Sequence, residues 1–353
     1  MKNNLIIKLA KKKDKIEIQK FIDSNFKKNH ILSRNHKLFK WAYVDKKINC
    51  AVALLNKKIV GIYLYIPLYQ FDKKLKKNHH IFGSLWTIKG FKKNQTKNFN
   101  KKKIIIALRL FQKTFQLVKT DLDIAIGLDA RFYKFHKSQG YEKIGKLNHH
   151  FIVSPYINKT KILDISILSK TKKIKKNKLK IRYKKIKKIS DFKKFKVDNL
   201  FKYQIPLKSK IYLIKRYLKH PIYKYHIYLI YNKKALNICV FRIVKFNNTN
   251  VIRFIDYVGS NKSFLHLKTF FNEIFILHNA EYLDFYSYGI PLDILKNTGL
   301  INKDNNKKII VPNYFEPFVN KNIDIHIGFR KFNERGKIRI FKGDGDQDRP
   351  NFD

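Results

Sequence analysis

Carboxylates crowd into the end of the chain, where FKGDGDQDRPNFD carries Asp344, Asp346, Asp348 and Asp353. Alternate aspartates around glycine could ligate calcium, but an EF-hand loop also needs a glycine at its sixth position and a glutamate at its twelfth. Counting from Asp344, the sixth residue is Arg349 and the twelfth falls beyond residue 353, so no calcium or other metal site is expected. Closely spaced carboxylates suit a cationic amine, and Arg349 suits a phosphate, which makes Asp344, Asp346 and Arg349 candidates for substrate binding. The alternative is a frayed, solvated terminus.

Three further polar residues stand where a cleft beside a sheet would expose them. His30 lies in a loop before an expected short helix, and His149 is followed directly by His150. Neighbouring residues of a strand point to opposite faces, so at most one of these two can face a cleft. Asp256, flanked by apolar residues in FIDYVG, is a candidate for holding an amine. The alternatives are solvent-facing or structural histidines and a salt-bridged aspartate.

Composition restricts the class of protein. The 353 residues suffice for two domains, and 44% apolar residues with 29 Phe and 20 Tyr exclude wholesale disorder. The sequence contains no run of about 18 apolar residues, so no transmembrane helix is expected. The segment MKNNLIIKLAKKKDK lacks a signal-peptide cleavage site. Cys50 and Cys239 each sit in an apolar run, which is typical of buried thiols. We therefore expect a cytoplasmic protein.

The formal net charge of +53 has two interpretations. Only 11 of the 78 basic residues are Arg, although phosphate and base recognition favour arginine. Lysine spread along the whole chain beside abundant Asn, Ile, Phe and Tyr is what an AT-rich coding sequence produces. The other interpretation is binding of anions, such as the phosphates of a cofactor. A non-enzymatic nucleic-acid binder using the lysine-dense segment 169–188 also stays open, and its affinity would fall steeply with salt.

Both halves of the chain show the same order of elements: strand, helices, hairpin, strand, long helix, strand, helix, strand. In the first half a helix over 12–26 precedes a hairpin over 50–71, and a later long helix carries its apolar face at Ile104, Leu108, Phe111 and Phe115. YEKIGKLNHHFIVSPY is expected to supply the last strand or hairpin of that half. Antiparallel strands followed by β-α-β-α predict an α/β fold. We expect a domain at 1–156, a lysine-rich linker at 157–180 and a second domain with the acidic tail at 181–353.

This order of elements resembles the GCN5-related N-acetyltransferase (GNAT) fold, twice over. ARFYKFHKSQGYEKIGK is similar to the late motif of that family, in which an alanine and an aromatic residue precede a Gly-aromatic pair. NHILSRNHKLFKWAYVD, KLNHHFI and FKGDGDQDRPN resemble a bacterial subgroup associated with surface-polysaccharide and amino-sugar pathways. The resemblance implies two GNAT-like domains, each with a mixed, mostly antiparallel sheet flanked by helices. It also implies an N-acyltransferase that uses acetyl-CoA or another acyl-CoA to acylate an amino group of a sugar or sugar nucleotide.

The same resemblance suggests residues for the chemistry. Acyl transfer from a thioester to an amine benefits from an acid for the departing thiolate. Tyr133 and His136, seven and four residues before Gly140, are the candidates, and ordinary core packing is the alternative for Tyr133. Asp256 would act on the acceptor amine, while His30, His149 and the tail would bind the acceptor.

The donor site is implied by analogy in two segments. They are Trp86, Thr87 and Ile88 on a strand, whose backbone would meet the oxyanion, and Lys101, Lys102 and Lys103 at the start of the long helix. Trp86 could stack on adenine or sugar, or simply be a core residue. The chain departs from the family because Gly90 comes too early for the usual glycine-rich loop before that helix, so lysine charge would replace close backbone contact with phosphate.

A second enzyme class pairs two GNAT-like domains. FemAB-like aminoacyltransferases use aminoacyl-tRNA as the donor, and the basic surface of the chain would then bind tRNA phosphates. Binding of coenzyme A distinguishes the two donors.

Overall fold

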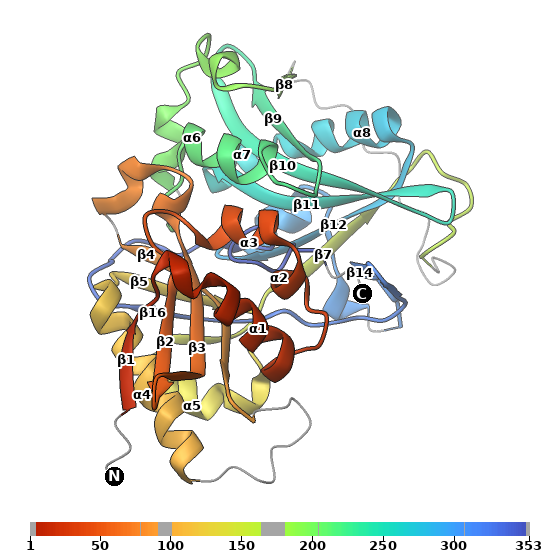
Figure 1. Ribbon diagram of the computed structural model, residues 1–353. Coiled ribbons are helices and arrows are strands. Elements are labelled where there is room, and N and C mark those ends of the chain that lie inside the picture. The colour runs from red at the N-terminus through yellow and green to blue at the C-terminus, as the bar shows by residue number, and fades with distance from the viewer. Residues whose placement is uncertain are drawn as a thin grey trace. The chain divides into compact units, whose positions relative to one another are not determined.

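The structure is a computed structural model in which two compact units alternate along the chain (Figure 1). It describes residues 5–77, 79–90, 101–163, 181–203, 205–306 and 308–350. Unit 1 comprises Met1–Ile144, Ile327–Arg335 and Arg349–Asp353, and unit 2 comprises Gly145–His326 and Gly336–Asp348. Each unit is built on one mixed, mostly antiparallel sheet flanked by helices, which confirms the predicted fold class. The predicted domain boundaries stay a prediction, and residues 164–180 of the expected linker lie outside the described residues.

The sheet of unit 1 has the order β1-β2-β3-β4-β5-β16-β6. Its strands are β1 (Leu5–Leu9), β2 (Cys50–Leu55), β3 (Lys58–Pro67), β4 (His80–Ile88), β5 (Leu122–Ile126), β6 (Lys143–Lys146) and β16 (His326–Lys331). Asn56 and Lys57, both with positive φ, make the tight turn of the expected hairpin between β2 and β3. β4 and β5 run parallel, whereas β3–β4 and β5–β16 are antiparallel.

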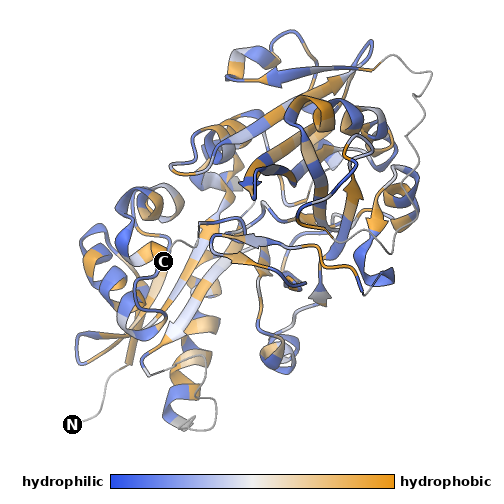
Figure 2. Ribbon diagram, turned by 90° about the vertical axis from the view of Figure 1, so that its right-hand side faces the viewer, coloured by the Kyte–Doolittle hydropathy of each residue, from blue (hydrophilic) through white to orange (hydrophobic). Residues whose placement is uncertain are grey.

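Helices cover both faces of this sheet. They are α1 (Lys15–Asn25), α2 (Ile31–Arg34), α3 (His36–Tyr43), α4 (Lys101–Val118) and α5 (Tyr133–Ser138). Phe111 and Phe115 of α4, one helical turn apart, pack on Tyr63 of β3. The neighbouring residues Ile62 and Leu64 are equally buried and must point to the other face, because side chains alternate along a strand. Figure 2 shows hydrophobic and hydrophilic residues alternating along the helices, as packing of one side on a sheet requires.

The sheet of unit 2 has the order β13-β7-β12-β11-β10-β9-β8, with β17 paired to β12. Its strands are β7 (Asn148–Val153), β8 (Arg182–Ile186), β9 (Tyr225–Tyr231), β10 (Ala235–Phe246), β11 (Thr249–Gly259), β12 (Ala280–Tyr288), β13 (Ile301–Asn302) and β17 (Ile340–Phe341). β11 and β12 run parallel, and β12 pairs antiparallel with both β7 and β17. A separate small hairpin joins β14 (Tyr314–Phe315) to β15 (Phe318–Val319).

The core of unit 2 is aromatic. Its helices are α6 (Lys210–Leu213), a π-helical turn (Ile214–Leu218), α7 (Asn261–Phe264), α8 (Leu267–His278) and α9 (Leu292–Asn297). Phe270, Phe271 and Phe275 of α8 pack on Phe254 and Phe285 of the two parallel strands. Asn279 ends α8 in the left-handed conformation, which an asparagine tolerates better than most residues.

Each sheet includes a strand from the opposite end of the chain. β16, near the C-terminus, pairs with β5 in unit 1, and β7, from the first half, pairs with β12 in unit 2. The segment YEKIGKLNHHFIVSPY therefore contributes β6 to one sheet and β7 to the other. Among the described residues, no helix is both long enough and apolar enough to cross a membrane.

A buried carboxylate of β12 anchors the first residues of the expected linker. Glu281 is fully buried, and its oxygens accept hydrogen bonds from the backbone N–H groups of Lys161, Ile162 and Leu163 at 2.8, 3.0 and 2.8 Å. A segment with little regular structure is thereby fixed to the sheet.

We expect Glu281→Ala to lower the free energy of unfolding by about 3 kcal/mol, because three backbone N–H groups lose their acceptor. Urea unfolding followed by circular dichroism measures the change. Glu273→Ala, at an exposed position of α8, is the control and should cost less than about 0.5 kcal/mol. Equal effects of the two substitutions would show that the carboxylate does not anchor the segment.

Candidate active site

The middle of β4 is irregular at one residue. The register between β3 and β4 shifts between the pairs Tyr65–Gly83 and Leu64–Leu85, which leaves Ser84 as an extra residue. The Ser84 hydroxyl lies 2.5 Å from the hydroxyl of Tyr43, at the end of α3. A bulge of this kind bends a strand and changes the direction of the residues beyond it.

Beyond this bulge β4 and β5 separate. Their parallel pairing covers His80–Gly83 opposite Leu122–Ala125, and β4 then continues to Ile88. Within the described residues no strand pairs with β4 on that side beyond Gly83, whereas β3 follows its other edge to Ile88. We call this separation the β4–β5 fork.

The predicted donor residues of β4 lie past the point of separation. Trp86 stacks on Phe135 of α5 at 5.3 Å between ring centroids and also contacts Phe111 of α4. Its indole N–H and the hydroxyl of the buried Thr87 have no hydrogen-bond partner among the described residues. Ile88 is buried. The stacking supports Trp86 as part of an aromatic wall, and its role toward a ligand stays a prediction.

The two candidate acids differ in their surroundings. His136 is only 4% exposed and is enclosed by the rings of Phe111, Phe135 and Tyr141. Burial, with a smaller contribution from Arg330, lowers its pKa to about 4, so the ring is neutral at neutral pH. Tyr133 is half-buried at the first position of α5, just after a turn capped by the Asp129 carboxylate.

A buried acid of β5 lies beside the last residues that pair the two strands. Asp123 is fully buried, and the hydroxyl of Tyr141 donates a hydrogen bond to its carboxylate. Burial raises the pKa of Asp123 to about 6, against the opposing influence of Tyr141 and Arg330. A Cβ on Gly83 would lie 2.6 Å from the Tyr63 hydroxyl and 3.8 Å from an Asp123 oxygen, so only glycine fits there. Asp123 was not among the residues predicted for the site; its position inside the apolar run LDIAI was the available signal.

The first turn of α4 is positively charged, and its role as a phosphate site stays a prediction. It contains no acidic residue, and the positive end of an 18-residue helix adds to the charge of Lys102 and Lys103. The side chain of Lys101 and residues 91–100 lie outside the described residues. Gly90, with φ of +73°, stands beside this turn, because a Cβ there would lie 2.9 Å from Lys103 Nζ. The fold thus brings Gly90 next to the start of α4, although ten residues separate the two in the sequence.

His30 and Arg349 both belong to unit 1. The His30 ring caps α2 by accepting a hydrogen bond from the backbone N–H of Leu32 at 3.3 Å. Burial, followed by the charges of Arg349 and Lys27, lowers the pKa of His30 to about 3. The ring is neutral and has a structural role, while binding of an acceptor by these two residues stays a prediction.

The predicted residues of unit 2 have internal partners. Lys208 is fully buried, and its Nζ lies 2.7 Å from carboxylate oxygens of both Asp256 and Asp344. Although burial alone would lower the pKa of Lys208, the two carboxylates raise it above its ordinary value. Asp346 is buried close by in the tail. Sequence reasoning missed Lys208 because no pattern in IPLKSK marks a buried lysine.

His149 is also enclosed in unit 2. Its ring stacks on Tyr286 at 3.9 Å, and its Nε2 lies 3.6 Å from Asp284, which Arg253 holds at 2.6 Å. Burial lowers the pKa of His149, against the effect of Asp284. The predicted site residues therefore fall into two groups, one in each unit.

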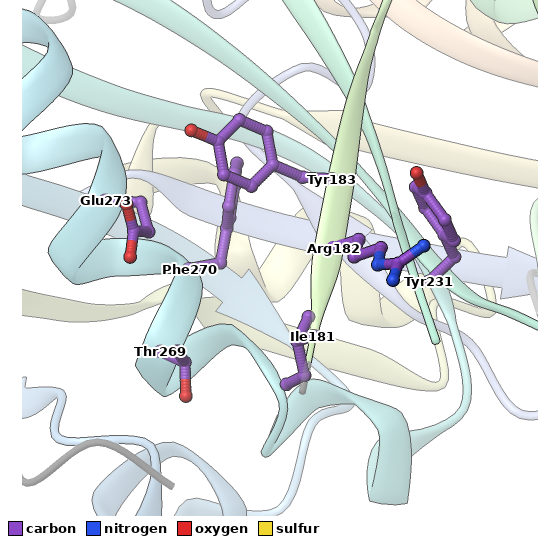
Figure 3. A pocket seen from close by; sticks show the side chains of 7 residues that line it. All are labelled: Ile181, Arg182, Tyr183, Tyr231, Thr269, Phe270 and Glu273. Carbon is purple, nitrogen blue, oxygen red and sulfur yellow. The ribbon is translucent and has the colours of Figure 1, made fainter. Parts of the chain in front are cut away.

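A pocket of about 420 Å³ lies at the edge of unit 2 (Figure 3). Tyr183 of β8 and Phe270 of α8 form an aromatic wall with 5.1 Å between ring centroids, and Glu273 projects from α8. Arg182 precedes Tyr183 in the strand and so points to the other face, beside Tyr231. None of the predicted site residues lines this pocket. No group of three His, Cys, Asp or Glu residues suited to a metal occurs in the part of the chain that the structure describes.

Two solved structures resemble the chain over most of its length. One is a GCN5-related N-acetyltransferase from Anabaena variabilis ATCC 29413, with a TM-score of 0.53 at 12% identity, covering 83% of this chain and 68% of that one. The other is a conserved protein of unknown function from Enterococcus faecalis V583, described as a probable N-acyltransferase, with a TM-score of 0.54 at 10% identity, covering 94% and 73%. The chain has a GNAT fold. No protein-family model and no curated protein matches its sequence.

The resemblance that ARFYKFHKSQGYEKIGK suggested is supported at the level of the fold. Sugar pathways and the pairing of two catalytic domains are not part of that likeness.

We expect the titration of Asp123 to affect stability. The folded state holds its proton more tightly than the unfolded state, so this carboxyl disfavours folding as the pH rises from about 4 to about 6. The rise in pKa from 3.8 to about 6 corresponds to about 3 kcal/mol. Asp123→Asn removes this titration. The difference in free energy of unfolding between this variant and the native protein should therefore grow in favour of the variant as the pH rises from about 4 to about 7, by about 3 kcal/mol in total.

Urea unfolding at several pH values measures the difference for Asp123→Asn. Asp293→Asn, at an exposed position of α9, is the matched control. A difference for Asp123→Asn that stays constant with pH would contradict the expectation.

Proposed function

We propose that the chain is an N-acyltransferase that moves an acyl group from acyl-CoA to an amine, with the donor bound at the β4–β5 fork. The observation that carries the proposal is the GNAT fold with a strand, β4, whose backbone continues five residues past its last pair with β5. An extended donor arm can hydrogen-bond to the edge of a strand as another strand would. Acetyl-CoA is the donor that we propose to test first.

The chain offers groups for each part of the donor. Lys101, Lys102 and Lys103 with the first turn of α4 would hold its phosphates, and the nearby Gly90 allows close approach of the backbone. The backbone at Trp86, Thr87 and Ile88 would donate to the thioester oxygen as negative charge develops there. The aromatic wall of Trp86 and Phe135 would exclude water from the thioester.

The reaction needs one bond formed and one broken. The nitrogen of a neutral amine attacks the thioester carbon, the carbon–sulfur bond breaks, and the extra proton of the nitrogen is lost to solvent. The departing thiolate takes a proton, for which Tyr133 is the better donor, because its hydroxyl lies on a half-buried residue at the start of α5. His136 is enclosed by rings and is already neutral.

The acceptor that we propose is the amino group of a sugar or sugar nucleotide used in surface-glycan assembly. Arg349 suits a phosphate of such a substrate, and His30 lies in the same unit. Asp256, Asp344 and His149 are engaged in ion pairs and stacking within unit 2, so we assign them structural roles. An acyl-CoA donor implies a cytoplasmic location, which is part of this proposal.

We expect saturable binding of acetyl-CoA in isothermal titration, and this binding should survive an increase in salt. Lys102→Ala with Lys103→Ala should weaken it about 10-fold, which corresponds to about 1.4 kcal/mol. Lys113→Ala, at an exposed position of the same helix, is the matched control. Absence of acetyl-CoA binding, together with binding of aminoacyl-tRNA, would replace the proposed donor.

We expect Tyr133→Phe to lower kcat about 100-fold while the KM for the donor stays the same, because the acid acts only on the departing thiolate. Release of the CoA thiol with a panel of amino sugars measures the rate. Tyr156→Phe, at an exposed tyrosine, is the control. An unchanged kcat would exclude Tyr133 as the acid.

A further inference from the structure

The parallel strands of unit 2 separate in the same way as those of unit 1. β11 and β12 pair up to Phe254 and Phe285, and β11 then continues to Gly259. Here another strand enters the separation: β17 pairs with Ser287 and Tyr288 of β12. On the other side, the backbone N–H of Gly343 donates to the carbonyl of Ile255 in β11 at 2.9 Å. Residues 340–343 therefore satisfy backbone groups of both separated strands.

We propose that the β11–β12 fork of unit 2 is a binding site for an acidic peptide, and that residues 340–348 are its ligand, held within the same chain. The proposal rests on contacts inside unit 2 and does not depend on the donor proposed for unit 1. It assigns the acidic tail to the inside of a basic unit rather than to an acceptor or to solvent.

The apolar part of this peptide fits an aromatic recess. Phe341 is fully buried and lies 5.8 Å from the ring of Phe285 and 6.3 Å from that of Tyr257. Two residues later the fit excludes a side chain, because a Cβ on Gly343 would lie 2.5 Å from the Tyr217 hydroxyl and 2.6 Å from Ile255 Cγ2. The site therefore selects an aromatic residue with a glycine two positions after it.

Charged groups fix the middle of the peptide. Asp344 binds Lys208 at 2.7 Å, and its other oxygen accepts the backbone N–H of Phe341 at 2.9 Å. The guanidinium of Arg216 donates to the carbonyls of Gly343, at 3.2 Å, and Gly345. Lys208 and Arg216 come from outside the peptide and are buried, so they form the basic wall that selects it.

A second anchor fixes the end of the peptide. Arg242 of β10 donates to both oxygens of Asp348, at 2.9 and 3.2 Å, and the Tyr225 hydroxyl donates to it at 2.7 Å. Arg242 with Lys342 holds the pKa of Asp348 below its usual range, although burial opposes this. These contacts pair a buried charge at the end of the peptide with a buried charge of the site.

A nick in the intact chain tests the proposal. A specific protease site inserted after Arg335, in an exposed segment before β17, allows the folded protein to be cut there. We expect the C-terminal fragment to stay bound in size-exclusion chromatography and native mass spectrometry. An excess of a synthetic peptide of residues 337–348 should displace it slowly.

Substitutions in the competing peptide test the contacts without changing the folded protein. Peptides with Gly343→Val or Asp348→Asn should compete about 100-fold less well than the native peptide, because the first clashes with Tyr217 and Ile255 and the second replaces the carboxylate that accepts two hydrogen bonds from Arg242 with a neutral amide. A Lys337→Ala peptide, changed at an exposed residue outside the contacts, is the matched control and should compete like the native one.

A second measurement uses the uncut chain. Asp348→Asn should raise hydrogen exchange in residues 340–348 while leaving β1, β2 and β3 of unit 1 unchanged. Loss of the fragment from the cut protein under native conditions, or equal competition by all peptides, would overturn the proposal.

Discussion

Buried backbone N–H and C=O groups need hydrogen-bond partners, and a separating pair of parallel strands leaves some of them without a neighbouring strand. In unit 2, residues 340–343 supply these partners: they form backbone hydrogen bonds with β12 and with the carbonyl of Ile255 in β11. In unit 1 the edge of β4 beyond Gly83 meets no other strand of the described residues. The difference between the two forks is the basis for placing the chemistry in unit 1.

The scarce carboxylates of this basic chain are concentrated where cations are buried. Lys208 is held by Asp256 and Asp344, Arg253 by Asp284, and Arg242 by Asp348. A buried cation is costly unless it is paired, whereas an exposed lysine needs no partner. The high net charge thus coexists with an electrically balanced interior, and the tail completes that balance.

Sequence patterns predicted the fold class well, because the hairpin at 50–71 and the apolar face of α4 are local signals. Patterns could not predict that β7 joins the sheet of unit 2, since strand pairing over such sequence distances leaves no periodic trace. The sequence identified candidate residues by their chemical type, but it could not predict which side chains would surround them. His136 proved to be packed among rings, and Lys208, which forms an ion pair with Asp256, stands in a segment without any pattern.

The exchange of β7 and β16 has a consequence for synthesis on the ribosome. The last residue of β5 is Ile126, but its partner β16 begins only at His326, so 199 residues separate the two strands. The edge of β5 that pairs with β16 therefore has no partner strand until almost the whole chain has been translated. Contacts between residues so far apart in the sequence also form slowly. During that interval β5 is an exposed apolar edge, which chaperones are suited to shield.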